Sequence, residues 1–335
     1  MMSDFNLLPP EVDVFVLGTG LPESIIAAAC SKAGLTVLHV DRNGYYGGIY
    51  SSFHFDGLNE WMETQESTKE FDQSTIDSTL LNENEQILLS RGPMVDLLCQ
   101  SEVAKYCEFK CIDRLLHCVD GQTMDSGNPV MNFQIVPCSR ADIFQSEVLS
   151  VMEKRRIMKF FNSCMEWQEN DKEIRDCMDQ PFDVFLESHG VSGNLKTMTA
   201  DAIGILQTDS TTKEGLDAVF RFMQSVGRYG NSPFLWTMFG SGDLAQCFSR
   251  KCAVFGGTYC LKRKVEGFVI SNEKVVAVIS ENQRINCKYL IIDPTYLPEQ
   301  FLKKPEENNA IQRAIIISDK SVLPQDQEHV LLLLL

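Results

Sequence analysis

The sequence is poor in positive charge and has no long apolar run, and both absences narrow its function. Lys and Arg number 30 against 46 Asp and Glu, which gives a formal net charge of −16. Because nucleic-acid phosphates are bound by basic surfaces, this charge argues against nucleic acid as a partner and favours a protein with a basic surface. The terminal VLLLLL is shorter than the run of about 18 apolar residues that a membrane span needs, so no transmembrane segment is expected.

The sequence also lacks a signal peptide and the cysteine spacing of a zinc site. Residues 1–13 have no basic segment followed by an apolar run, so we expect no signal peptide and a cytoplasmic protein. Twelve cysteines are present, but no C-x-x-C pair occurs, and Cys107 and Cys111 have no His or second Cys pair at zinc spacing. These patterns predict reduced thiols and no metal site.

No catalytic constellation is visible in the sequence. The five histidines are scattered, and Ser24, in the segment GLPES, does not lie in a nucleophile elbow. We therefore expect a non-catalytic protein.

The stretch from residue 12 to residue 48 has the order of a dinucleotide-binding βαβ unit. Its parts are an apolar strand at 12–17, a glycine turn at 18–20, an Ala/Ile-rich helix at 23–31 and a second strand at 36–40. Asp41 follows about 20 residues after the turn, where such a site places the acid that binds the ribose. This order predicts an α/β fold with a FAD/NAD(P)-binding, Rossmann-like domain.

Glu23 stands where the third glycine of the G-x-G-x-x-G pattern is expected. Its carboxylate would occupy the helix N-terminus that otherwise accepts a pyrophosphate, and the two negative charges would repel each other. We therefore interpret Gly18, Gly20, Glu23 and Asp41 as a structural frame without a bound cofactor. The alternative is a flavin site, which would make the chain an oxidoreductase.

The pattern of polar and apolar residues divides the rest of the chain into segments. Residues 62–86 are polar, acidic and without period, which predicts a solvated loop or a partly disordered insertion. Residues 140–228 carry apolar residues at helical spacing, whereas strand-like patterns precede and follow them. We therefore predict a discontinuous α/β domain of residues 1–139 and 229–335, interrupted by an all-helical domain of residues 140–228.

Several segments together resemble the Rab GDP-dissociation inhibitor and Rab escort protein superfamily, from about residue 12 to residue 297. They are GTGLPE, LHVDRNGYYGG, GRYGNSPFLWTMFGSGDLAQCFSR and CAVFGGTYCL. The resemblance implies a GDI-type fold, which FAD-dependent oxidoreductases share but which this family uses without the flavin. It also implies binding of GDP-bound Rab GTPases.

The segment VPCSRADIFQSEVLSVMEKRRIMKFF is similar to the escort branch of this superfamily. Escort proteins present new Rabs to geranylgeranyl transferase type II and deliver the prenylated Rabs to membranes, which implies a cytosolic protein with transient membrane association. The alternative within the superfamily is a dissociation inhibitor.

The resemblance places a Rab-binding platform on Tyr46, Asp243, Arg250 and Tyr259. Aromatic residues and Arg suit this role, because they often supply most of the binding energy of an interface. Asp243 stands where the family usually has Glu, which keeps the charge but shortens the reach. From the residues alone, Tyr259 is also compatible with a half-buried strand aromatic, and Arg250 with a surface ion pair.

Phe144 and Arg155 match the positions through which the escort branch docks the α-subunit of the transferase. The alternative is a hydrophobic staple, in which Phe144 folds back on a helix capped by Ser146. Arg155 would then belong to a solvated basic patch.

The resemblance further implies a site for the geranylgeranyl lipid of the Rab tail. The helical segment offers apolar residues for it, although most of them suit an ordinary core: Met158, Phe161, Met165, Met198, Ile205, Phe220 and Met223. Members of the family continue with a long segment after the region of residues 315–323. We therefore expect the α/β domain to be truncated at its C-terminus.

Overall fold

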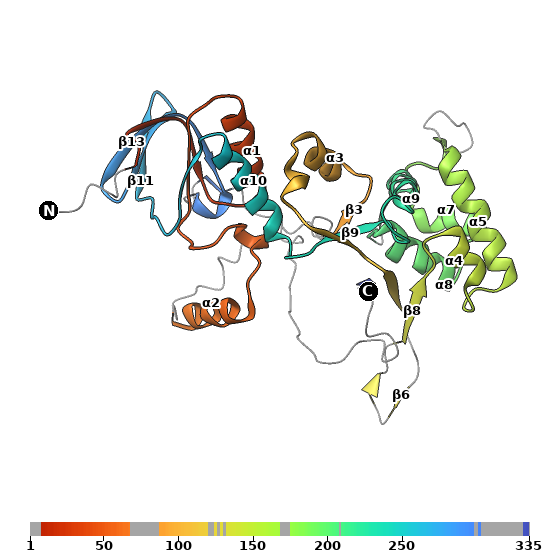
Figure 1. Cartoon of the computed structure of the whole chain (residues 1–335). Helices are drawn as coiled ribbons and strands as arrows, with labels where there is room; N and C mark the ends of the chain where they lie inside the picture. Colours follow the sequence, from red (N-terminus) through yellow and green to blue (C-terminus); the bar gives the residue numbers. More distant parts are fainter. Residues whose placement is uncertain are drawn as a thin grey trace. The chain divides into compact units, whose positions relative to one another are not determined.

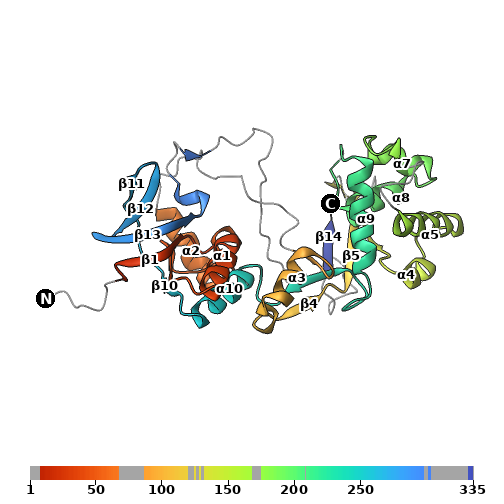
Figure 2. The same ribbon diagram turned by 90° about the horizontal axis from the view of Figure 1, so that it is seen from above.

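The protein forms two compact units, and each is built from segments far apart in the sequence (Figures 1 and 2). The first unit consists of residues 1–86, 100–108 and 237–313, and the second of residues 87–99, 109–236 and 314–335. The structure is a computed structural model. It describes residues 8–67, 87–119, 124–125, 128–129, 132–167, 175–207, 209–297, 301–302 and 331–334.

A six-stranded sheet forms the centre of the first unit. Its strands are β1 (Glu11–Leu17), β2 (Val37–Val40), β10 (Thr258–Cys260), β11 (Gly267–Ser271), β12 (Lys274–Ser280) and β13 (Gln283–Ile292). They follow the order β10-β2-β1-β13-β12-β11, in which β10, β2, β1 and β13 are parallel and β11 and β12 are antiparallel to their neighbours. Every residue of β2 is buried, as expected of an apolar strand inside a parallel sheet.

Two helices, α1 (Leu21–Lys32) and α10 (Gly242–Val254), lie side by side in the first unit (Figure 1). The Ser31 hydroxyl on α1 donates a 3.0 Å hydrogen bond to the Cys252 carbonyl of α10. The order β1, α1, β2 with parallel pairing of the two strands is the predicted βαβ unit, so the Rossmann-like expectation is confirmed.

Further helices complete the described part of the first unit. They are η2 (Gly48–Tyr50), α2 (Phe55–Ser67), η5 (Val103–Lys105) and η7 (Pro294–Tyr296). α2 includes residues 62–67, which the sequence assigned to a loop; Met, Glu and Gln in this stretch are good helix formers. Residues 68–86 of that predicted loop lie outside the described residues.

The second unit combines short strands with helices. Its strands are β3 (Leu88–Leu89), β4 (Phe109–Cys111), β5 (Arg114–Val119), β6 (Met124–Asp125), β7 (Asn128–Pro129), β8 (Asn132–Val136), β9 (Phe234–Thr237) and β14 (Leu331–Leu334). Its helices are α3 (Pro93–Gln100), α4 (Arg140–Gln145), α5 (Val151–Glu166), α7 (Phe182–Ser188), α8 (Asn194–Thr197), the π-helix η6 (Met198–Gly204) and α9 (Thr212–Ser225). The last residues of α3 and β9 belong to the first unit.

The observed division differs from the predicted one. The elements described within residues 140–228 are helical, as predicted, apart from one isolated bridge between Pro181 and Thr211. The strands β5 and β8, however, belong to the same unit as these helices. Leu115 of β5 and Val136 of β8 are part of one buried cluster with helical residues such as Phe161, so the apolar core continues from the helices into the strands.

The terminal leucines form a strand of the second unit. β14 pairs in parallel with β5, with Leu331 opposite Arg114, and the sheet has the order β14-β5-β8. Within the described ranges, no helix has the length and apolarity required to cross a membrane.

Candidate functional site

The carboxylate of Asp41 is fully used by the protein itself. It is 1% exposed at the end of β2. Its Oδ2 atom accepts hydrogen bonds from the Thr19 backbone N–H at 2.8 Å and the Thr19 hydroxyl at 2.7 Å. Its Oδ1 atom accepts from the Asn43 N–H at 2.7 Å and from the Tyr296 hydroxyl at 2.5 Å. A carboxylate offers about four acceptor positions, so none remains for a ribose hydroxyl.

Glu23 fills the turn that would receive a pyrophosphate. A side chain on Gly20 would collide with the Glu23 carboxylate, and Asp293 lies against the same turn. Burial raises the pKa of Glu23 to about 7; a hydrogen bond to its own backbone opposes this rise, and the charges of Asp293 and Asp41 add to it. A pyrophosphate here would meet three carboxyl groups. The residues of this frame therefore do not fit a dinucleotide.

Two platform residues meet beside the sheet. Tyr259 on β10 and Tyr46, in the turn after β2, have ring centroids 6.0 Å apart, and the ring of His39 lies 4.8 Å from that of Tyr259. Both tyrosines are half-buried, and the Tyr259 hydroxyl is enclosed without a hydrogen-bond partner among the described residues. Burial also raises the pKa of both hydroxyls, so they remain neutral donors at neutral pH. The side chains of Cys252 and Ser249 act on this hydroxyl, so it is enclosed by the protein's own residues.

The other two platform residues share one face of α10. Asp243, Cys247 and Arg250 are four and three residues apart, so they lie one above the other along the helix. This face meets the segment after η5. The Cys247 thiol donates to the Tyr106 carbonyl at 3.3 Å, and the exposed Arg250 guanidinium stacks 4.9 Å above the Tyr106 ring. Arg250 thus has a cation–π contact, and it has none of the ion pairs found among the described residues.

The two pairs are close in the fold. The turn that carries Tyr46 abuts the start of α10: a side chain on Gly47 would lie 3.2 Å from the Gly242 backbone. The Gly242 N–H donates to the Ser52 hydroxyl at 3.1 Å. All four predicted platform residues therefore belong to one unit and to adjoining elements.

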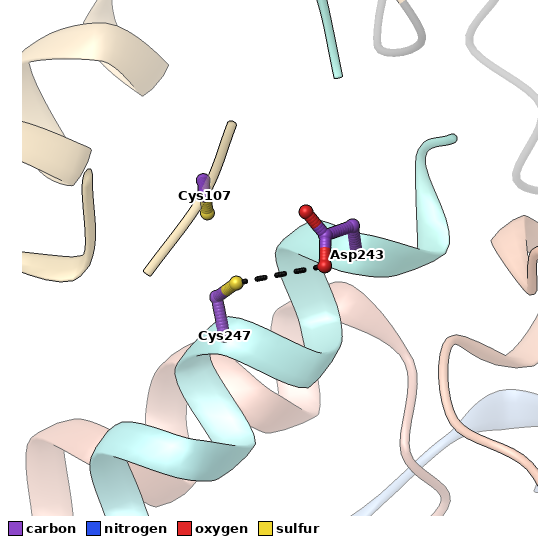
Figure 3. Close-up of side chains that lie close together, drawn as sticks. All are labelled: Cys107, Asp243 and Cys247. Carbon is purple, nitrogen blue, oxygen red and sulfur yellow. Dashed lines mark hydrogen bonds between the residues drawn. The ribbon is translucent and has the colours of Figure 1, made fainter. Parts of the chain in front are cut away.

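A second cysteine, Cys107, lies beside Asp243 and Cys247 of α10 (Figure 3). The thiols of Cys107 and Cys247 and the Asp243 carboxylate lie within 4.8 Å of one another. Cys247 donates to Asp243 Oδ1 at 3.7 Å, whereas Asp243 Oδ2 is buried and has no partner in the described part of the chain. From the sequence, Cys107 was considered only together with Cys111, and no metal site was expected. The cluster was missed because only the fold brings residue 107 to α10. The sole sequence signal was the i, i+4 spacing of Asp243 and Cys247.

Phe144 is exposed on the second unit. It is the next-to-last residue of α4, which begins after the Ser139 cap, and 68% of its surface is accessible. The predicted cap at Ser146 is wrong: α5 begins after Ser150, whose hydroxyl and Glu153 form a capping box. The residue before that cap is Leu149, which is buried. The staple interpretation of Phe144 therefore does not hold.

Phe144 is part of a larger apolar surface at the start of α5. The members of this α4–α5 patch are Phe144, Val148, Val151 and Met152, each more than half exposed. Arg155 follows one turn later on α5 and is also exposed. Lys154 donates to the Phe144 carbonyl at 3.0 Å, so the backbone under the phenyl ring is held in place. An exposed apolar patch beside basic residues is typical of a protein-binding surface.

The residues suggested for a lipid groove are mostly core. Phe161 and Met198 are buried in the main cluster of the second unit, and Met158, Ile205 and Met223 pack against it. A pocket of about 540 Å³ in this unit has a different lining, which includes three arginines: Arg91, Gly92, Pro93, Asp96, Arg221, Gln224 and Arg228. None of the predicted apolar residues lines this pocket.

Comparisons with known proteins agree with this geometry. The family model "GDI: GDP dissociation inhibitor" matches residues 8–335. "Rab proteins geranylgeranyltransferase component A 1" of Caenorhabditis elegans is 39% identical over 381 residues, which cover 97% of this chain and 73% of the relative. The human protein of the same name is 29% identical, with 97% and 72% covered. "Guanosine nucleotide diphosphate dissociation inhibitor 2" of Arabidopsis thaliana is 31% identical, with 95% and 70% covered.

Solved structures show the same fold. A Rab GDI from Plasmodium falciparum superposes with a TM-score of 0.66 at 24% identity, over 86% of this chain and 66% of that one. An oxidoreductase from Methanosarcina mazei gives a TM-score of 0.53 at 18% identity, over 87% and 62%. The chain is thus shorter than these proteins and spans about 70% of the curated relatives above.

Proposed function

The chain belongs to the GDP dissociation inhibitor family, and from this membership we propose that it is a Rab escort protein. In this role it binds unprenylated, GDP-bound Rab GTPases, presents them to geranylgeranyl transferase type II and delivers the prenylated Rabs to membranes. The proposal includes contacts with the α-subunit of the transferase and with the geranylgeranyl chain. It assigns no catalytic step to the chain itself, which acts as an accessory subunit in the cytosol.

The α4–α5 patch carries the choice of an escort protein over a dissociation inhibitor. An escort protein needs a surface for the transferase, and the patch offers an exposed Phe144 with the exposed, basic Arg155 beyond it. Leaving a phenyl ring in water is unfavourable, and its burial in a partner's pocket would recover about 1.5–3 kcal/mol. The identity to curated relatives named component A, up to 39%, supports the same choice.

The decisive experiment is Rab prenylation in vitro by purified transferase, with and without this chain. We expect the chain to stimulate incorporation of the geranylgeranyl group into GDP-bound Rab. Extraction of prenylated Rab from membranes without any stimulation would select the dissociation inhibitor. Stoichiometric flavin absorption by the purified protein would contradict both, and would favour the oxidoreductase.

The Rab platform is tested separately. Arg250→Ala and Tyr46→Ala are each expected to weaken binding of Rab·GDP at least about fivefold, because each removes an aromatic or guanidinium contact of hot-spot type. Arg284→Ala is the matched control, since it removes an exposed Arg on β13 that is not a predicted platform residue. Unchanged affinity of both platform variants in a titration would refute the assignment.

The transferase contact has its own pair of variants. Phe144→Ala is expected to abolish pull-down of the transferase while Rab·GDP binding is retained. Val184→Ala, which truncates a 54% exposed apolar residue on α7 of the same unit, is the control and should retain both. Full retention of the transferase by Phe144→Ala would sink the docking proposal.

A further inference from the structure

The cluster of Cys107, Asp243 and Cys247 has the composition and the spacing of a metal site. We propose that these side chains bind a thiophilic divalent cation of the zinc(II) class. Two cysteines and one carboxylate are ligands that zinc commonly takes, and three protein ligands leave a fourth position for water. Asp243 is also one of the predicted Rab platform residues, so the test below measures metal binding directly and does not rely on Rab affinity.

The distances suit a tetrahedral ion. With zinc–sulfur and zinc–oxygen bonds of about 2.3 and 2.0 Å, the edges of a tetrahedron are about 3.8 Å between sulfurs and about 3.5 Å between sulfur and oxygen. Cys247 Sγ lies 3.7 Å from Asp243 Oδ1, and all three ligand atoms lie within 4.8 Å of one another. Only small side-chain rotations separate this arrangement from a coordinated one. Asp243 and Cys247 already face the segment of Cys107 from successive turns of α10 (Figure 3).

The carboxylate of Asp243 lacks a partner that a cation would supply. Its Oδ2 atom is buried and accepts no hydrogen bond among the described residues. Glu108, the residue after Cys107, adds a second negative charge that acts on this carboxylate. An enclosed carboxylate oxygen without a partner is destabilising, and a divalent ion bound with two thiolates would supply that partner.

A disulfide between the two cysteines is the competing outcome. A disulfide requires an oxidant to act on the buried Cys107 thiol. A metal ion needs no oxidant, because coordination itself displaces the thiol proton. A disulfide would also leave Asp243 Oδ2 unpaired, whereas the ion uses it.

A bound ion would join two elements of the first unit. Cys107 follows η5, whereas Asp243 and Cys247 belong to α10, so coordination would link the segment of residues 103–107 to this helix. The present contacts across this junction include one thiol–carbonyl hydrogen bond, the Arg250–Tyr106 stack and an ion pair between Lys251 and Glu102. Metal binding to the folded protein alone would stabilise this unit by mass action.

The test uses the full, reduced chain. The protein is dialysed against Zn²⁺ with a weak competing chelator, and bound metal is counted by plasma mass spectrometry. Co²⁺ then replaces Zn²⁺, and its absorption reports thiolate ligation and tetrahedral geometry. We expect one equivalent of metal and a thiolate-to-cobalt band. Because this measurement uses the wild-type chain, it is decisive even if the variants fold poorly: less than one equivalent, or no thiolate band, overturns the proposal.

Variants identify the ligands. Cys107→Ala and Cys247→Ala should each lose the bound equivalent, and Asp243→Asn should weaken Co²⁺ binding at least about tenfold. Cys99→Ala removes an exposed thiol outside the cluster and should bind as the wild type does. Retention of the metal by both cluster variants would overturn the proposal, as would peptide mapping that shows a Cys107–Cys247 disulfide in protein incubated with Zn²⁺.

Discussion

Replacing Glu23 with glutamine removes a buried charge but keeps the size of the side chain and an acceptor for its own backbone amide. The carboxyl has a pKa of about 7 in the fold, against an ordinary value of 4.5. Between these pH values the folded protein binds a proton that the unfolded chain does not. Stability is therefore lost as the pH rises from about 4.5 to about 7, and the loss is complete above that range.

The size of this effect follows from the shift. A difference of about 2.5 pKa units corresponds to at most about 3 kcal/mol, and residual solvation of the carboxylate lowers our expectation to about 2 kcal/mol. Glu23→Gln should thus be more stable than the wild type by about 2 kcal/mol at pH ~8 and nearly equal to it at pH ~5. For a unit of this size, the difference at pH ~8 is a Tm increase of about 5 °C.

The assay is thermal and denaturant unfolding of both proteins across this pH range. The difference between the two curves isolates Glu23 from the other titrating groups. Glu273→Gln is the control, because Glu273 is exposed in the turn between β11 and β12 and should show no pH-dependent difference. Equal stability of Glu23→Gln and the wild type at pH ~8 would refute the conclusion that the turn holds a buried carboxylate.

Two further substitutions test the packing of the second unit. Gly215→Ala would drive a methyl group into the ring of Phe182, so we expect a loss of about 1–3 kcal/mol in unfolding experiments despite the better helix propensity of Ala; a stabilised variant would contradict the contact. Gly267→Ala, where a side chain would meet nothing within 4 Å, is its control and should change little. Ser150→Ala removes the cap that binds the Glu153 N–H and should cost about 1 kcal/mol, read as a lower Tm; an unchanged Tm would mean that the capping box does not stabilise α5.

Local order in the sequence was sufficient for the βαβ unit. The strands and the helix are marked by runs of apolar residues, and the turn by its glycines. As a result, β1, α1 and β2 lie within two residues of their predicted positions. The same local signal misled at the start of α5, where Ser146 and Ser150 are both acceptable caps. Glu153 decides between them, since its carboxylate completes the capping box only with Ser150.

The division into units depended on packing that no local pattern records. β5 and β8 read as strands and were assigned to the α/β domain. Leu115 and Val136 are nevertheless buried in the core of the helical segment, and burial of that shared surface decides which unit they join.

The contact between two predicted platform residues also depended on long-range packing. Motif matching named Tyr46 and Tyr259, but only the parallel pairing of β10 with β2 explains why their rings meet.

The glycine turn illustrates both contributions. The sequence by itself determined that Glu23 replaces a glycine, and hence that a charge of the wrong sign faces any pyrophosphate. Only the tertiary structure decided that Asp41 is unavailable as well, because its partner Tyr296 is 255 residues away in the chain and reaches it through the pairing of β13 with β1. Composition and spacing determine what a residue can do chemically, whereas the neighbours that compete for its hydrogen bonds, and bring Cys107 to α10, are set by long-range packing.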